Sequence, residues 1–372
     1  MDKDKLSTDI IITDQFPGGN ITVDRIEGND IDISQDLRDT KPWWHYWNFK
    51  IVVNRPQKLF FHFKDEIIGY FGPAINEGNG WHYDKTTFID HRNFNYDFLH
   101  SGTYQFAFSI PYQVEDFERF FEIISPQSKK HFAVKTNSGR DQFYITAGNQ
   151  KSDSFILFTC RHHACESMAE FVLEGILMEL ILTSNPVIRD CAIYCFPFID
   201  LDGVENGDQG KDRQPHDHNR DYIDEPIYPI TKFLMKFIKS KPLLYSFDLH
   251  CPAKYYDIHD YMSLIQLEAP YNKEQERFSR CLEKQNHQDK CSIEYLQEHN
   301  IVHGKDWNIG KSKGCSRFCN ESGAKLALTF ETPYFGHRNK PYMPQELREF
   351  GKSFGKAIIQ YHADSNIKKF EN

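Results

Sequence analysis

The hydrophobic pattern divides the chain into two parts. Up to about residue 125, short aromatic and β-branched runs are separated by Gly, Pro and Asn, a pattern typical of an antiparallel β-sandwich. Tyr104, Phe106 and Phe108 alternate with other residues, which predicts inward-facing positions along one strand. The strands expected in this part lie at 43–53, 58–65, 67–72, 86–90 and 103–110, and a helix is expected at 111–124.

Beyond residue 125, continuous apolar runs replace the alternating ones. The buried strands expected here are 155–160, 191–199, 243–249 and 326–330, with helical patterns at 167–182 and 230–240. Buried strands that alternate with helices indicate an α/β fold with a mainly parallel mixed sheet flanked by helices. We therefore expect an all-β sandwich domain over residues 1–125 and an α/β domain over residues 126–372.

The composition argues against some classes of function and favours one cellular location. The 372 residues carry a net charge of −9, which argues against general binding of nucleic acid or anionic membranes, since both need basic surfaces. No apolar run is long enough for a membrane span, and the first residues lack the pattern of a signal peptide. Nine cysteines, an odd number, favour reduced thiols, and we expect buried cysteines in a cytoplasmic protein.

Polar residues follow several of the predicted buried strands. The carboxyl ends of parallel strands meet at one edge of an open α/β sheet, where ligands bind. A long polar loop, 200–225, also follows one of these strands. The residues that come directly after the other three strands are Arg161, His162, His163 and Glu166, then His250, and then Glu331.

His163 and Glu166 are spaced HxxE, so both side chains can converge on one ion across a first helical turn. With His250 they form a His₂Glu set, and three protein ligands with an open position are typical of catalytic zinc. A lone histidine at a strand end is more often simply hydrogen-bonded, and we interpret His162 in that way, pointing to the opposite face. Glu331 is either a member of a structural ion pair or, beside a zinc ion, a general base.

Asn219 and Arg220 follow Asp217 in the sequence DHNR. The planar guanidinium of arginine matches a carboxylate through two parallel hydrogen bonds, and asparagine adds a neutral donor. Such a pair suits an enzyme that recognises a free carboxylate on its substrate. The alternative is a surface loop with assorted charges.

These motifs together resemble the zinc metallocarboxypeptidases of the carboxypeptidase A superfamily. The resemblance covers roughly residues 130–365 and rests on HxxE at 163–166, DHNR at 217–220, His250 in FDLH and Glu331 in LTFETPY, in that order. The β-rich segment in front resembles the N-terminal domain of the cytosolic carboxypeptidase branch and its bacterial relatives. The resemblance implies that the second domain is catalytic.

The resemblance also implies a role for each matching residue. One zinc ion per chain is bound by His163, Glu166 and His250, and Glu331 is the general base. Asn219 and Arg220 bind the terminal carboxylate of the substrate. Asp217 orients a zinc-binding histidine, and Asp248 is a second candidate for that role. Arg213 is expected to polarise the scissile carbonyl, with Arg161 and Lys211 as alternatives. The tyrosine that closes over substrate in this family has no counterpart between Tyr295 and Tyr334.

The sequence therefore predicts a zinc-dependent carboxypeptidase that hydrolyses the C-terminal bond of a peptide or protein tail, with zinc-activated water and Glu331 as base. One alternative is a zinc amide hydrolase acting on acylated amino acids or cell-wall peptides. Another is a non-catalytic binding protein on a degenerate carboxypeptidase fold. The first domain is expected to shape access to the cleft. Side-chain preference and oligomeric state are left open by the sequence.

Overall fold

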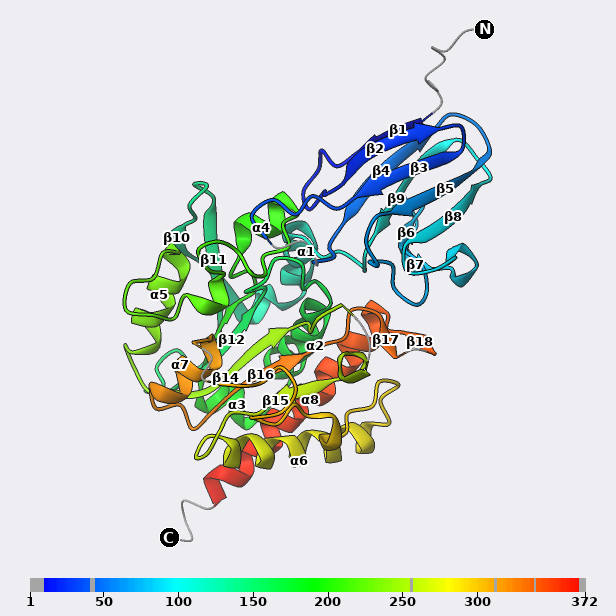
Figure 1. Cartoon of the computed structure of the whole chain (residues 1–372). Coiled ribbons are helices and arrows are strands. Elements are labelled where there is room, and N and C mark those ends of the chain that lie inside the picture. The colour runs from blue at the N-terminus through cyan, green and yellow to red at the C-terminus, as the bar shows by residue number, and fades with distance from the viewer. Residues whose placement is uncertain (1–9, 41–43, 255–256, 311–312, 338, 368–372) are drawn as a thin grey trace, which may run out of the picture.

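The first part of the chain is a two-sheet β-sandwich (Figure 1). The computed structural model describes residues 10–40, 44–254, 257–310, 313–337 and 339–367. One sheet has the order β1(Ile10–Thr13), β4(Asn48–Val53), β9(Gly102–Ala107), β6(Ala74–Asn76) and β7(Trp81–Tyr83). The other has the order β2(Thr22–Glu27), β3(Asp30–Ser34), β5(Gln57–Phe63) and β8(Asn93–Phe98).

Aromatic rings fill the space between these sheets. Phe61 stacks on Phe94 with ring centroids 4.5 Å apart, and Phe106 lies 5.6 Å from Phe94. Rings at this separation add to the free energy gained by burying their area. Tyr104, Phe106 and Phe108 are all buried, which confirms the predicted inward face.

Two of the strands expected in this part are wrong. Residues 67–72 form a loop with one isolated bridge, although Ile67 and Ile68 are fully buried. Residues 86–90 hold the end of the 3₁₀ turn Lys85–Thr87 and an isolated bridge from Phe88 to Phe94. Aromatic and β-branched residues report burial more directly than they report an extended ladder. Conversely, β2 is almost wholly exposed and carries no alternating apolar pattern that could predict it.

The second part has a seven-stranded mixed sheet with a parallel centre. The strand order is β10(Ser128–Lys135), β11(Asp141–Gly148), β13(Ala192–Phe196), β12(Phe155–Cys160), β14(Leu243–His250), β16(Leu326–Glu331) and β15(Ser263–Ile265). The four strands from β13 to β16 are parallel, and the outer strands pair antiparallel. The mixed, mainly parallel sheet of the sequence prediction is confirmed in this centre. A separate two-stranded ribbon joins β17(Gly336–His337) to β18(Lys340–Pro341).

Helices cover both faces of the sheet (Figure 1). One face packs under α2 and α8, with α6 against α8, and the other packs under α5 and α7. The helices are α1(Val114–Ile124), α2(Met168–Leu182), α3(Pro186–Asp190), α4(Leu201–Asn206), α5(Pro229–Ile238), α6(Asn272–Asp289), α7(Cys315–Glu321) and α8(Pro344–Ile367). No helix of the described residues is long and apolar enough to cross a membrane.

The two parts share one continuous hydrophobic core. Its buried side chains run from the sandwich into the larger sheet and reach α8. Phe117 of α1 packs on Phe143 and Phe198, with ring centroids 5.6 and 5.8 Å away, so α1 rests on the second part. The sandwich strands end at Ala107, and the boundary at residues 125/126 stays a prediction.

Candidate active site

Three strand ends bring the predicted residues together. β12, β14 and β16 are neighbours in the parallel centre, and His250 pairs in register with Glu331. After β12 the chain turns through Arg161, which has a left-handed φ of 57°. The Arg161 guanidinium is buried and donates to the carbonyl oxygens of Ala164 and Tyr112, at 2.9 and 2.8 Å. These bonds fix the turn that carries His163 and Glu166 toward β14.

His163, Glu166 and His250 form a compact ligand set. His163 Nδ1 lies 2.8 Å from Glu166 Oε1, and His250 Nδ1 lies 2.8 Å from Glu166 Oε2. One ligand atom from each of the three lies within 4.8 Å of the others. Glu166 and His250 are buried, while the His163 side chain keeps 12% of its surface exposed. Two imidazoles and a carboxylate that leave one side accessible suit zinc, which takes three protein ligands in catalytic sites.

The charges of this set also suit a divalent cation. Burial disfavours a charge on His250, yet Asp248 and Glu166 raise its pKa well above the usual value. Burial opposes the charge of Glu166 as well, but His163, Lys211 and His250 together lower its pKa well below the usual value. A histidine must be neutral to bind a metal ion. A bound cation would therefore displace the protons that these histidines otherwise hold.

Asp248 links His250 to a buried chain of hydrogen bonds. Its Oδ2 lies 2.9 Å from His250 Nε2, and its Oδ1 lies 2.8 Å from His162 Nδ1 and accepts from the Thr159 hydroxyl at 2.7 Å. The other ring nitrogen of His162 lies 2.7 Å from the Tyr222 hydroxyl. The expectation that His162 points away from the site is therefore wrong, because its ring stacks 5.5 Å from that of His250.

His162, Asp248 and His250 are a second group with metal-ligand spacing. His162 and Asp248 are fully buried, and each already has hydrogen-bond partners, so this group is better described as the support of His250. A carboxylate behind a ligating histidine sets its tautomer and orientation. Asp217 stands in a similar place behind His163, with Oδ1 at 3.7 Å from its Nε2.

Glu331 is a buried carboxylate beside the ligand set. Only 6% of its surface is exposed, and its Oε2 receives no hydrogen bond from any described residue. Burial raises the pKa of Glu331 to about 7; His250 and Lys211 oppose that rise, and Glu166 adds to it. A buried carboxylate oxygen without a hydrogen-bond donor is costly in free energy. Such a group, with a perturbed pKa at a strand end, is a candidate general base.

The structure does not bring Arg213 to the ligand set. Its guanidinium donates to Asp39, Asp200 and Asp208 at 2.5, 2.7 and 3.0 Å, so its charge is already neutralised by carboxylates. The alternative Arg161 is committed to the turn after β12. The sequence could not show this pairing, because the polar loop 200–225 allows no unique alignment and the three aspartates meet Arg213 only in the folded chain.

Of the three candidates Arg213, Arg161 and Lys211, it is Lys211 that contacts the ligand set. Its Nζ lies 2.7 Å from Glu166 Oε1 and donates to the carbonyl oxygens of Cys251 and Pro252 at 3.0 and 2.8 Å. Lys211 is 5% exposed, and burial disfavours its charge, but Glu166, Cys165 and Glu331 together raise its pKa above the usual value. The ammonium group is thus a buried, fixed positive charge beside the ligand set.

Asn219 and Arg220 lie in the short turn His218–Arg220, directly after Asp217, which is the residue behind His163. Asn219 Oδ1 accepts from the backbone N–H of Cys315, at 3.2 Å, which anchors the turn to the start of α7. Arg220 is exposed, and its Nη1 donates to the Asn219 carbonyl. No carboxylate of the described chain pairs with Arg220, so its guanidinium is open to an anionic ligand.

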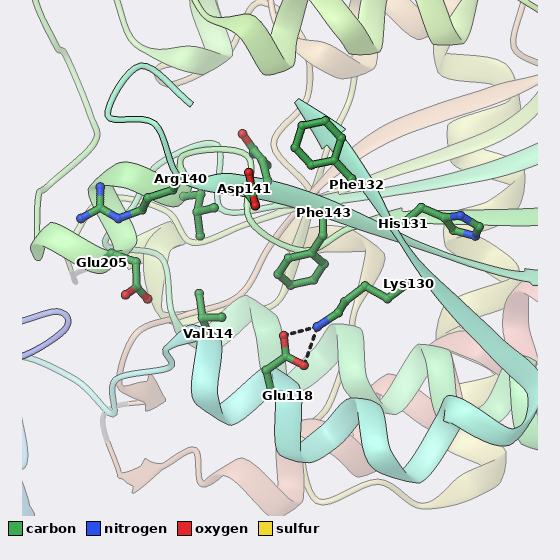
Figure 2. A pocket seen from close by; sticks show the side chains of 11 residues that line it. Val114, Glu118, Lys130, His131, Phe132, Arg140, Asp141, Phe143 and Glu205 are labelled. Carbon is green, nitrogen blue, oxygen red and sulfur yellow. Dashed lines mark hydrogen bonds and ion pairs between the residues drawn. The ribbon is translucent and has the colours of Figure 1, made fainter. Parts of the chain in front are cut away.

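The surface cavity in Figure 2 lies away from this site. It has a volume of about 450 Å³ and lies between α1 and the β10–β11 hairpin, where Glu118 pairs with Lys130. None of the residues predicted for metal, base or carboxylate binding lines it. Among its charged groups, Lys130 pairs with Glu118, Asp141 with Lys135 and Arg140 with Asp202.

Comparison with known proteins finds similarity in structure only. No protein-family model matches the sequence, and no curated protein matches it. A metallo-carboxypeptidase from Burkholderia cenocepacia superposes with a TM-score of 0.80 at 16% identity, over 95% of this chain and 99% of the other. A Pseudomonas aeruginosa metallo-carboxypeptidase, in complex with (2-guanidinoethylmercapto)succinic acid, gives 0.75 at 17% identity, over 94% and 98%.

A carboxypeptidase A from Helicoverpa armigera matches a smaller share of the chain, 68%, with a TM-score of 0.53 at 12% identity. The chain therefore has the metallo-carboxypeptidase fold. The bacterial structures cover nearly the whole chain, sandwich included, which confirms the predicted architecture of a β-domain before an α/β domain.

Proposed function

We propose that this protein is a zinc-dependent carboxypeptidase that removes the C-terminal residue of a peptide or protein tail. The observation that carries the proposal is the buried Glu331 beside the ligand set of His163, Glu166 and His250, with an Oε2 that receives no hydrogen bond from the described residues. A degenerate binding protein has no need to retain such a costly carboxylate. The nine cysteines are free thiols, in line with the cytoplasmic location that we propose.

The residues of the chain divide the chemistry among them. Zinc held by His163, Glu166 and His250 would supply a Lewis acid that lowers the pKa of water and polarises a carbonyl. Glu331 takes the proton of the attacking water and passes it to the leaving amine. Arg220 and Asn219 hold the terminal carboxylate of the substrate.

In this scheme Lys211, rather than Arg213, stabilises the negative charge that develops on the scissile carbonyl oxygen. A cation that is already fixed beside the site acts on the developing charge through space and needs no reorganisation during the reaction. Asp248 and Asp217 hold the two ligating histidines in orientation.

Lys211→Met is expected to lower kcat, whereas Arg213→Met is expected to lower the stability of the fold. Lys211→Met lowers kcat by about 10²–10³-fold, an effect of the size found when one stabilising group is removed from an oxyanion site. Arg213→Met instead removes the cation that Asp39, Asp200 and Asp208 share and lowers the free energy of unfolding by about 3 kcal/mol, with kcat changed little per folded molecule. Steady-state kinetics and denaturant unfolding of both variants measure this. A large loss of kcat in a stable Arg213→Met variant would return the catalytic role to Arg213.

Arg220→Met is expected to act on substrate binding. Losing a charge-assisted contact with the terminal carboxylate raises KM by roughly 10- to 100-fold, while the melting temperature stays unchanged because the side chain is exposed. For the wild type, KM should be lower for peptides with a free C-terminus than for the same peptides with a C-terminal amide. For the variant, the two KM values should be similar. An unchanged preference for the free acid in Arg220→Met would remove Arg220 from this role.

A substrate panel tests the proposed reaction against its nearest rival. The zinc-loaded protein is offered a C-terminal peptide library and a set of N-acyl amino acids, and the products are identified by mass spectrometry. We expect release of single C-terminal residues from peptides. Hydrolysis confined to N-acyl amino acids would make the protein a zinc amide hydrolase instead.

A further inference from the structure

The loop that carries Lys211 is bound along its length by the N-terminal part of the chain. Gly18 N–H donates to the Glu205 carbonyl at 2.9 Å, and the Asn20 amide donates to the Gly207 carbonyl at 2.8 Å. Arg38 pairs with Asp208. These contacts join residues more than 160 positions apart in the sequence. The segment 205–213, from the end of α4 onward, therefore takes its shape from the sandwich side of the molecule.

Gln209 is the centre of the docking. Its Oε1 accepts the backbone N–H groups of His45 and Tyr46 at 3.1 and 2.6 Å, and its Nε2 donates to the Tyr46 carbonyl at 2.7 Å. Gln209 is 1% exposed. A buried amide with these bonds on a neighbouring backbone fixes both segments relative to each other. The residue just before this backbone, Trp44, is thereby placed beside Lys211.

Trp44 contacts Lys211 and its neighbour directly. The ring centroid of Trp44 lies 5.0 Å from Lys211 Nζ, and its Nε1 donates to Asp212 Oδ2 at 3.2 Å. Tyr334 offers a second ring to the ammonium, at 5.7 Å, and His45 packs on Tyr334 with centroids 5.0 Å apart. An indole face within about 6 Å attracts an ammonium group, and the attraction strengthens when water is excluded.

We propose that Trp44 is a positioning residue that holds the Lys211 ammonium beside Glu166, so that the N-terminal domain completes the active site. A lysine side chain has four rotatable bonds, and only walls on several sides confine it. Glu166 and the carbonyls of Cys251 and Pro252 contact the Lys211 ammonium group on one side, and the Trp44 ring contacts it on another. This inference rests on the proposed role of Lys211 in hydrolysis.

The kinetic test is a double-mutant cycle of Trp44→Leu and Lys211→Met. Trp44→Leu should lower kcat by roughly tenfold with KM nearly constant, the effect of losing a desolvated cation–π contact. In the Lys211→Met background the same change should have no further effect on kcat, since its target is gone. Trp44→Phe keeps an aromatic face and should recover most of the activity. Equal losses in both backgrounds would show a structural role and overturn the proposal.

A second readout needs no hydrolysis. Lys211 is 5% exposed in the wild type, so an amine-selective acylating reagent should leave it unmodified in the metal-free protein while exposed Lys129 reacts. In Trp44→Leu, Lys211 should become modified, as read by peptide mass mapping. Trp307→Leu, at a partly exposed tryptophan, is the matched control and should leave Lys211 protected.

If Trp44→Leu does not fold, Asp212→Ala removes the indole's hydrogen-bond partner and takes its place in both assays. Continued protection of Lys211 in a folded variant would overturn the proposal. A wild-type protein that hydrolyses no substrate would contradict the proposed function. The labelling result would still decide whether Trp44 holds Lys211.

Discussion

Glu331→Gln removes nearly all hydrolysis and leaves zinc bound. Glutamine fills the same space at the end of β16 but cannot accept the proton of the attacking water, so kcat falls by about 10²–10⁴-fold, the range of a general base. Glu331 is outside the set of three ligands, so metal content per chain should match that of the wild type. Kinetics with metal analysis on the same samples measures both quantities.

The control for this substitution is Glu298→Gln, because the Glu298 side chain is 75% exposed and far from the strand ends in sequence. It should retain wild-type kcat. The pH profile gives a second check on the base. Burial raises the pKa of Glu331 to about 7, and a nearby divalent cation favours the charged form, so wild-type kcat/KM should fall in acid with a midpoint below 7. Retained turnover in Glu331→Gln would exclude Glu331 as the base.

His250→Ala abolishes both zinc binding and hydrolysis. The substitution removes one of three ligands and leaves Glu166 and Asp248 buried without the group that joined them. We expect substoichiometric zinc and a loss of activity of at least about 10³-fold, because a structure without its metal lacks the Lewis acid. Metal analysis after dialysis measures the first effect and peptide hydrolysis the second.

Thermal unfolding separates metal binding from simple damage. Zinc at 100 times its Kd should stabilise the wild type by about 2.7 kcal/mol, and a chelator should remove that gain. His250→Ala should melt at the same temperature with and without zinc. His287→Ala, at an exposed histidine, should behave as the wild type. Zinc-dependent stabilisation of a folded His250→Ala variant would remove His250 from the ligand set.

The fold of the second part was predictable because its buried strands and its long helix each show a clear hydrophobic pattern within their own sequence. The apolar runs at 155–160, 243–249 and 326–330 are buried strands, and the helical pattern at 167–182 is α2. The sandwich was predictable in kind, although 67–72 and 86–90 were wrong as strands. Short antiparallel strands such as β6 and β7 depend on their partners more than on their own three residues.

The candidate site was predictable where the chemistry is carried by a motif. The structure brings His163, Glu166, His250 and Glu331 together as expected from their place at strand ends. The ion pairs of Arg213 could not be predicted, because its partners Asp39, Asp200 and Asp208 are brought together only by the fold. The contact of Trp44 with Lys211 left no signal in the sequence, since 167 positions separate them (211 − 44).

One measurement tests the central claim most directly. The protein is freed of metal, reloaded with one equivalent of zinc, and incubated with a peptide of known sequence while mass spectrometry follows the product masses. The account predicts a ladder that shortens from the C-terminus one residue at a time, stops on chelation and resumes with zinc. Stoichiometric zinc with no shortening of free-acid peptides, or internal cleavage in place of a C-terminal ladder, would contradict it.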